Sequence, residues 1–430
     1  MVLRYDLPPV AYEDSLTQSQ CLVRNKDTGS VFQENHQVQL KQVIKKLLWV
    51  TYLKLTGNYA GLSADIVPPD APKAVIITAG GNLGGAIMSI PLIEAARERW
   101  PKTHLAVVAN TQAGADIIKF TGLGDSHHVA PAVVLDKSLF HTGYRAMKTE
   151  LRSFKKTLSK LQPEVLIDNH NYGIARLMLD LNIPTRIGHV GVTPNAEVLT
   201  WDDFYNIKVP CHQGLNWLAA YADLAKSFDG VLNHYPSIIV DSASRDWATK
   251  MLREAGLRDN QKAIAVQAGV WQVQDFKQWP IASLVKTCSD LWSKEKIAPV
   301  VFGTPGQEDV FAIIKAELPP EANPINMIGR TTSAEFACLL SVCAATLAND
   351  SGIMHLSAAV GTPTIAIYGM TNPEITWCYG SDPKHRIVRR PDISPCYGLH
   401  DHLIQACEDR PCLSGINHDI VTSTIRDVMN

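Results

Sequence analysis

Short apolar runs alternate with helical stretches along most of this chain, and this alternation constrains the fold more than any other feature. From Ala74 onward the runs are brief, end at glycine or polar residues, and are separated by segments with apolar residues at helical spacing. Such a rhythm is typical of a parallel sheet whose strands are joined by crossover helices. It breaks near 231–241 and then restarts. We therefore expect an α/β protein with two Rossmann-like, doubly wound domains.

Ligands in open α/β sheets bind outside the carboxyl ends of the strands, so two such domains facing a cleft can hold a nucleotide and an acceptor. We expect residues 73–235 to bind the acceptor and residues 236–430 to bind the nucleotide. The last helix is expected to cross back to the first domain. The expected strands are 74–78, 105–109, 165–168, 186–188, 263–266, 299–302, 345–348 and 364–367, and the expected helices are 86–100, 113–121, 282–295, 308–317, 333–342, 354–360 and 416–429.

Residues 1–72 differ in pattern and form an expected N-terminal extension. A hairpin is predicted over 21–33 and a basic amphipathic helix over 40–54, before a proline-rich linker at 68–72. Such a helix packs on its own domain or on a second subunit, as in a homo-oligomer, or rests on an anionic membrane surface. The last alternative implies at most peripheral membrane contact.

Composition narrows the function classes. The formal net charge is −2, which gives no basic surface of the kind that nucleic-acid binding requires. No stretch approaches the roughly 20 uncharged apolar residues that span a bilayer. The nine cysteines are scattered and odd in number, unlike a secreted disulfide framework. We expect a cytoplasmic protein with reduced thiols.

The most informative motif follows the strand at 345–348 and reads Asn349-Asp-Ser-Gly-Ile-Met-His355. Gly352 lets backbone approach a ligand, and the free N–H groups of a starting helix favour a pyrophosphate. His355, one turn into the helix, is placed to donate to a phosphate oxygen. Taken alone, the motif is also compatible with a plain βα unit and a buried histidine.

Two further strand ends support a nucleotide site. Lys277, in Lys277-Gln-Trp-Pro, offers a point charge for a phosphate. In Phe302-Gly-Thr-Pro-Gly-Gln-Glu308, Gly303 permits close approach and Glu308 is placed to accept from a ribose hydroxyl. Stabilisation of the first turn of a helix is the alternative role for Glu308.

These three motifs, in this order and spacing, resemble the heptosyltransferases of glycosyltransferase family 9, of the lipopolysaccharide-core or autotransporter type. The resemblance extends from about Val75 to the C-terminus. It implies a GT-B fold, ADP-heptose as donor, inversion at the anomeric carbon and no obligatory metal. It also implies donor contacts for Lys277, Asp350, Ser351, Gly352 and His355. Asp350 would order the phosphate loop or meet the sugar, because a carboxylate facing phosphate is repelled.

The family's first loop normally reads Gly-Asp, with a proline six residues after the Asp. Here the acceptor loop includes Gly81, Asn82, Gly84 and Gly85, and counting back from Pro91 places Gly85 at the position of the Asp. A positioned base typically contributes about 10²–10⁴-fold, and glycine cannot act as one.

Two residues near the end of the strand at 165–168 are candidate replacements for the missing base. His170 has a suitable unperturbed pKa, whereas Asp168 has a structural role as its alternative. Otherwise the base comes from the acceptor, or the protein does not catalyse. Asn82 can hydrogen-bond an acceptor but cannot take its proton.

Four cysteines gather in the sequence near the end of the chain: Cys378, Cys396, Cys407 and Cys412. Four thiolates can form a tetrahedral Fe or Zn site, although no pair has C-x₂-C spacing. A related subgroup, which heptosylates autotransporter proteins, binds iron through four cysteines and also has an N-terminal extension. Buried thiols without a metal are the alternative.

Three functions follow from these patterns. The first is an inverting transferase that moves heptose from ADP-heptose to a hydroxyl of a core saccharide, a protein Ser/Thr or a small glycoside. The second, favoured by Gly85, is a non-catalytic nucleotide-sugar-binding partner or scaffold. The third is a GT-B enzyme for another nucleotide sugar, against which the Lys277 and Asp350–His355 motifs argue.

Overall fold

The computed structural model divides the chain into two compact units. The N-terminal unit comprises Met1 and Val23–His234, and the C-terminal unit comprises Val2–Leu22 and Tyr235–Asn430. The structure describes residues 10–11, 51, 54–55, 66–131, 144–169, 178, 181–190, 204–211, 215–270, 272–396, 407 and 409–429. The expected hairpin at 21–33, most of the expected helix at 40–54 and His170 lie outside these residues.

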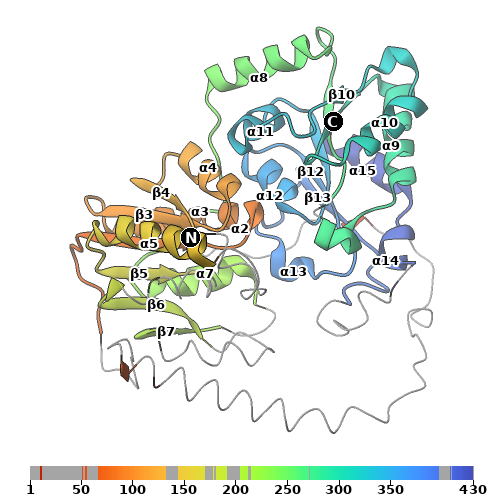
Figure 1. The fold of residues 1–430 in the computed structure, drawn as a ribbon. Coiled ribbons are helices and arrows are strands. Elements are labelled where there is room, and N and C mark those ends of the chain that lie inside the picture. Colours follow the sequence, from red (N-terminus) through yellow and green to blue (C-terminus); the bar gives the residue numbers. More distant parts are fainter. Residues whose placement is uncertain are drawn as a thin grey trace. The chain divides into compact units, whose positions relative to one another are not determined.

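The N-terminal unit contains a six-stranded parallel sheet in the order β4-β3-β2-β5-β6-β7. The first of these strands in sequence, β2, lies in the middle of the sheet. Strands β3 and β4 follow it towards one edge, and β5, β6 and β7 then extend the sheet from β2 towards the opposite edge (Figure 1). The strand order therefore reverses between β2 and β5. The strands are β2 (Ala74–Ala79), β3 (His104–Ala109), β4 (Ser126–Val129), β5 (Val165–Asp168), β6 (Thr185–Val190) and β7 (Ile207–Pro210).

The first helical segment after β2 is broken in two, unlike the single helix expected over 86–100. The break falls at Ser89, between α2 (Leu83–Met88) and α3 (Ile90–Arg99). Pro91, near the start of α3, has no N–H to donate to the carbonyl four residues before it, which explains the interruption. The other helices of this unit are α4 (Gln112–Phe120), α5 (Tyr144–Ser159) and α7 (Trp217–Lys226).

The C-terminal unit contains a seven-stranded parallel sheet in the order β1-β13-β12-β11-β8-β9-β10. Its strand order reverses between β8 and β11. The edge strand β1 (Val10–Ala11) comes from the N-terminal extension and pairs with Ile387 and Val388 of β13. The other strands are β8 (Ala263–Gln267), β9 (Ala298–Phe302), β10 (Ile325–Asn326), β11 (Ala345–Asn349), β12 (Thr364–Ile367) and β13 (His385–Val388).

The last helix, α15 (His418–Met429), packs on α9 (Ile281–Glu295) and belongs to the C-terminal unit. The expectation that it would cross back to the first domain is wrong, because its buried face (Val421 and Ile425) joins the core of this unit. The remaining helices are α8 (Ser242–Glu254), α10 (Glu308–Glu317), α11 (Ser333–Leu340), α12 (Gly352–Ala359), α13 (Pro373–Thr376) and α14 (Pro411–Ser414), with 3₁₀ helices at η5 (Gln272–Lys277) and η6 (Pro320–Ala322).

Each unit has its own apolar core, which fixes the position of its sheet. The central strands β2, β8 and β11 are buried along their whole length, as parallel strands covered on both faces must be. The doubly wound α/β fold expected from the sequence is confirmed in both units. Within the described residues, no helix combines the length and the apolar character needed to cross a bilayer.

Candidate functional site

Most of the nucleotide-site residues predicted from sequence meet at one place in the C-terminal unit. That place is the switch point of the sheet, where β8 ends at Gln267 and β11 ends at Asn349. Ligands of doubly wound folds bind at such a point because the loops on either side diverge and leave a crevice. The loop after β8 carries Lys277, and the turn after β11 carries Asp350 and Ser351.

Lys277 and Asp350 form an ion pair across these two loops. The distance from Nζ of Lys277 to Oδ2 of Asp350 is 2.7 Å, and their side chains are 16% and 5% exposed. The hydroxyl of Thr371 donates to the same carboxylate oxygen at 2.6 Å. Asp350 therefore holds the Lys277 ammonium beside the start of α12, which agrees with an ordering role for this carboxylate.

The side-chain amide of Gln267 forms hydrogen bonds to both of these loops. Its Oε1 accepts from the backbone N–H of Asn349 at 2.9 Å and from the hydroxyl of Ser351 at 3.0 Å. Its Nε2 donates to the carbonyl of Gly269 at 2.8 Å. The side chain of Asn349 accepts from the backbone N–H of Trp279 at 2.9 Å. These bonds fix the Lys277 loop against the turn that starts α12.

The amino end of α12 carries no side-chain cap. Ser351 is the N-cap residue, but its hydroxyl does not accept from the first turn. The first-turn N–H groups therefore lack the side-chain acceptor that a serine normally supplies at this position. With the dipole of the helix behind them, they suit an anionic group such as a diphosphate.

His355, on the first turn of α12, is buried. Burial lowers its pKa from 6.5 to about 4, although Asp350 opposes this shift and Lys277 adds to it. The imidazole is thus neutral at physiological pH, and its buried Nδ1 has no hydrogen-bond partner among the residues that the structure describes. A direct charge-assisted contact between His355 and a phosphate does not fit this environment, so its donor contact stays a prediction.

The loop after β9 is shaped around glycine. A Cβ added to Gly303 would lie 2.5 Å from Oε1 of Gln307, whose amide Nε2 donates to the carbonyl of Val270 at 2.9 Å. Glu308, the first residue of α10, is exposed and accepts from the N–H of Gly306 at 2.8 Å. This bond supports the local structural role of Glu308, and its ribose contact stays a prediction.

In the N-terminal unit, the glycine loop lies at the carboxyl end of β2. A Cβ added to Gly85 would lie 2.1 Å from the carbonyl oxygen of Gly80, closer than any real side chain approaches. The carbonyl of Gly85 also accepts from the hydroxyl of Ser89 at 2.7 Å. Asn82, by contrast, is exposed and does not cap α2. The loop therefore has no room for a carboxylate at position 85 in this conformation.

Asp168, the candidate base at the end of β5, is completely buried. Its Oδ1 accepts from the hydroxyl of Thr78 at 2.7 Å, and its Oδ2 accepts from the hydroxyl of Tyr205. The backbone N–H of Asn169 donates to Thr78 in turn. These contacts connect β2 and β5 with Tyr205, which lies just before β7. They therefore favour the structural role of Asp168 over proton removal from an acceptor.

The four C-terminal cysteines are not arranged as a ligand set. Within the described residues, the sulfurs of Cys378, Cys396, Cys407 and Cys412 form no group of three within 4.8 Å. Cys412 packs in the apolar core of the C-terminal unit, whereas Cys407 is exposed, which places them in different environments. The expectation of an Fe or Zn site formed by all four is therefore not supported by the geometry.

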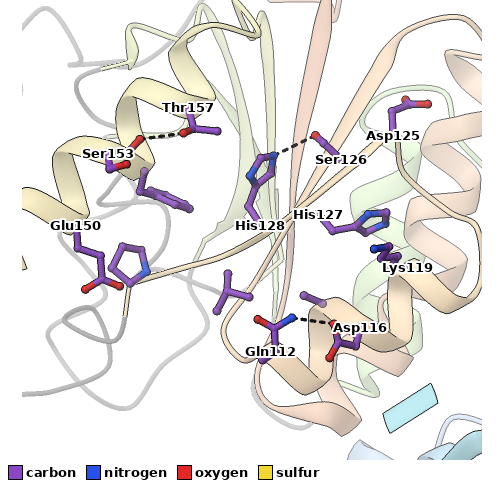
Figure 2. Close-up of a pocket in the computed structure, with 14 residues that line it drawn as sticks. Gln112, Asp116, Lys119, Asp125, Ser126, His127, His128, Glu150, Ser153 and Thr157 are labelled. Atoms are coloured by element: carbon purple, nitrogen blue, oxygen red, sulfur yellow. Dashed lines mark hydrogen bonds between the residues drawn. The ribbon is translucent and has the colours of Figure 1, made fainter. Parts of the chain in front are cut away.

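The N-terminal unit also contains a polar pocket of about 660 Å³ that no sequence motif predicted. Figure 2 shows Gln112 and Asp116 on α4, Ser126 and His128 on β4, and Thr157 on α5 around it. It lies along the edge strand β4 and contains none of the residues of the glycine loop. We assign no function to this pocket.

Sequence reasoning missed Gln267 and Thr371, which hold the predicted nucleotide-site residues in place. Gln267 is the single polar residue in the β8 run Ala-Ile-Ala-Val-Gln, and it stands at the carboxyl end. A polar side chain at that end of a buried strand is the signal that could have identified it. Thr371 follows β12 and carries no comparable signal.

Comparison with known proteins gives a match to a family model. The model of glycosyltransferase family 9 (heptosyltransferase) matches residues 151–399. Lipooligosaccharide heptosyltransferase 2 of Haemophilus influenzae is 36% identical over 102 residues, which are 23% of this chain and 29% of that protein. Lipopolysaccharide heptosyltransferase 2 of Escherichia coli is 33% identical over 105 residues, again 23% and 29%. The chain thus aligns with less than a third of the length of these curated relatives.

Solved structures of low sequence identity share the fold. A glycosyl transferase family 9 protein from Veillonella parvula has a TM-score of 0.65 at 18% identity, covering 85% of this chain and 98% of that one. The heptosyltransferase WaaC of E. coli, solved with ADP-2-deoxy-2-fluoro heptose, has a TM-score of 0.61 at 18% identity, covering 82% and 99%.

Proposed function

The chain belongs to glycosyltransferase family 9, and on that premise we propose that it is an inverting glycosyltransferase with ADP-heptose as donor. In the proposed reaction the acceptor hydroxyl attacks the anomeric carbon, the bond to the diphosphate breaks, and ADP leaves with that electron pair. A base takes the hydroxyl proton. The names of the matched relatives favour a lipooligosaccharide core saccharide as acceptor over a protein Ser/Thr or a small glycoside.

One observation carries the proposal: the Lys277–Asp350 ion pair lies beside the uncapped amino end of α12. Negative charge grows on the diphosphate as ADP departs, and catalysis depends on groups placed in advance to stabilise it. Lys277 supplies a full positive charge and α12 supplies N–H donors. Both lie at the switch point of the C-terminal sheet, the position at which doubly wound sheets generally bind ligands, and this supports the proposal.

Calorimetric titration with ADP tests the donor site. We expect wild-type protein to bind ADP and Lys277→Ala to bind it about 10- to 100-fold more weakly, as loss of one charge-assisted contact implies. Lys315→Ala, an exposed lysine on α10, is the matched control and should bind like wild type. UDP should compete poorly. Equal affinity of wild type and Lys277→Ala for ADP would contradict the proposed site.

A second function is favoured by Gly85: a nucleotide-sugar-binding partner without transferase activity. The glycine loop excludes a carboxylate at position 85, and Asp168 is buried in hydrogen bonds to Thr78 and Tyr205. His170 lies outside the described residues and stays a candidate base. Incubation with ADP-heptose and truncated core saccharide, followed by mass spectrometry, separates the two functions. Donor binding without a heptosylated product supports the partner role.

The location and assembly of the protein belong to the same proposal. A donor made from ADP and an acceptor of the core-saccharide class are consistent with the cytoplasmic location expected from the sequence. Homo-oligomerisation through residues 1–72 also stays a prediction, and sedimentation of the full chain beside a variant lacking residues 23–65 would test it.

A further inference from the structure

The N-cap of α12 differs from the threonine N-caps of α4 and α11. At α4 the side chain of Thr111 accepts from the N–H of Gly114, and at α11 the side chain of Thr332 accepts from the N–H of Glu335. The hydroxyl of Ser351 instead donates to Oε1 of Gln267 at 3.0 Å. Ser351 has the extended backbone usual for an N-cap residue, so its conformation does not prevent capping.

The side chain of Gln267 determines where this hydroxyl points. Gln267 is buried, and its amide is fixed from both ends, by the N–H of Asn349 and by the carbonyl of Gly269. Its Oε1 therefore stays next to Ser351 and offers a strong acceptor. An acceptor held in this way draws the hydroxyl away from the first turn of α12.

From this geometry we propose that Gln267 is a positioning residue that prevents Ser351 from capping α12 and so keeps the first-turn N–H groups open for the donor diphosphate. The inference rests on the proposed function. Two observations at the same turn point to a ligand independently of the open helix end. The Lys277 ammonium lies there, paired with Asp350, and the buried Nδ1 of His355 has no hydrogen-bond partner in the described part of the chain.

Loss of Gln267 should thus act through Ser351. In Gln267→Met the freed hydroxyl turns to the helix and accepts from the first turn, as Thr332 does at α11. A diphosphate must then displace that cap. We expect ADP affinity to fall by on the order of tenfold, the size of effect that one N-cap hydrogen bond exerts.

The test is a double-mutant cycle measured by calorimetric titration with ADP and by thermal unfolding. It uses the full chain as wild type, Gln267→Met, Ser351→Ala and the double variant. We expect Gln267→Met to weaken ADP binding in the wild-type background and to have little effect in the Ser351→Ala background, where no hydroxyl can cap the helix. Its melting temperature should stay within a few degrees of wild type, since the new cap offsets part of the lost bonding.

Each other outcome overturns the inference. Unchanged ADP affinity of Gln267→Met shows that Ser351 does not cap. Equal losses of affinity in both backgrounds show that Gln267 merely supports the loops. Absence of ADP binding by wild type contradicts the proposed function itself, which distinguishes the two failures. If Gln267→Met does not fold, Gln267→Asn replaces it, because this amide is one methylene too short to reach Ser351.

Discussion

Replacing Gly85 with aspartate should damage the N-terminal unit rather than restore a base. The change puts a carboxylate where the family's sequence pattern has one. The Cβ of the new residue, however, would lie 2.1 Å from the carbonyl oxygen of Gly80, where ordinary contact begins near 3.4 Å. The carbonyl of Gly80 would have to move away by more than an ångström. The backbone at Gly85 is not free to move instead, because its carbonyl accepts a hydrogen bond from the hydroxyl of Ser89.

The expected cost follows from this overlap. Overpacking of a well-packed site typically costs about 1–3 kcal/mol. In a unit of this size each kcal/mol lowers the melting temperature by about 2–4 °C, so we expect a fall of about 2–12 °C. Gly85→Ala should show the same fall, because the steric overlap comes from Cβ and not from the charge.

Differential scanning fluorimetry and product analysis with ADP-heptose would measure both consequences. Asn82→Asp is the matched control, since it adds the same charge to the same loop at an exposed N-cap position, where a carboxylate is favourable. It should melt at or above the wild-type temperature. A Gly85→Asp protein that melts like wild type and transfers heptose faster would refute the reasoning about a glycine-shaped loop.

Three further predictions concern buried ionisable side chains. Lys277→Met should destabilise the C-terminal unit by about 3–5 kcal/mol in urea unfolding, because it leaves the buried Asp350 carboxylate without its counter-charge. Asp350→Asn in that background should recover part of the loss. Asp168→Ala should lower the melting temperature of the N-terminal unit, because it removes the carboxylate that accepts from two buried hydroxyls, whereas Asp168→Asn should melt close to wild type. Loss of transfer in Asp168→Asn without loss of stability would instead identify a base. Burial lowers the pKa of His355 and His385 from 6.5 to about 4, so on acidification the unfolded chain takes up protons before the folded chain does. The free energy of unfolding should therefore be unaffected by these histidines above pH 6.5, and should fall by up to about 1.4 kcal/mol per pH unit for each of them as the pH drops towards 4. Urea titrations at pH 7.5 and 5 would detect this loss.

The central strands of both sheets could be predicted from sequence, whereas the edge strands could not. Strands β5 and β12 have the predicted bounds, because a parallel strand covered on both faces appears as a short uninterrupted apolar run. The edge strand β4 reads Ser-His-His-Val and is half-exposed throughout, so it has no such run. The edge strand β7 has a lysine in its middle and ends at a proline. An edge strand that has solvent on one side therefore lacks the uninterrupted apolar run by which a buried strand is recognised in the sequence.

The candidate site could be predicted only as far as local motifs extend. Lys277 and Asp350 follow different strands, and the rule that ligands bind at the carboxyl ends of strands predicts from the sequence that they lie together. The bond from Ser351 to Gln267 depends on the spatial adjacency of β8 and β11, which are far apart in sequence. The overlap at Gly85 depends on the path of the loop and not on residue type.

The pairing of β1 with β13 has a consequence for biosynthesis. Val10 leaves the ribosome on the order of 380 residues before its partner Ile387 is made. At common translation rates this is a wait of roughly 20–75 s, during which the N-terminal unit can complete its own sheet. This edge of the C-terminal sheet is therefore closed by residues that are made long before the other strands of that sheet. A fragment that begins at Tyr235 would leave the edge of β13 bare and prone to self-association.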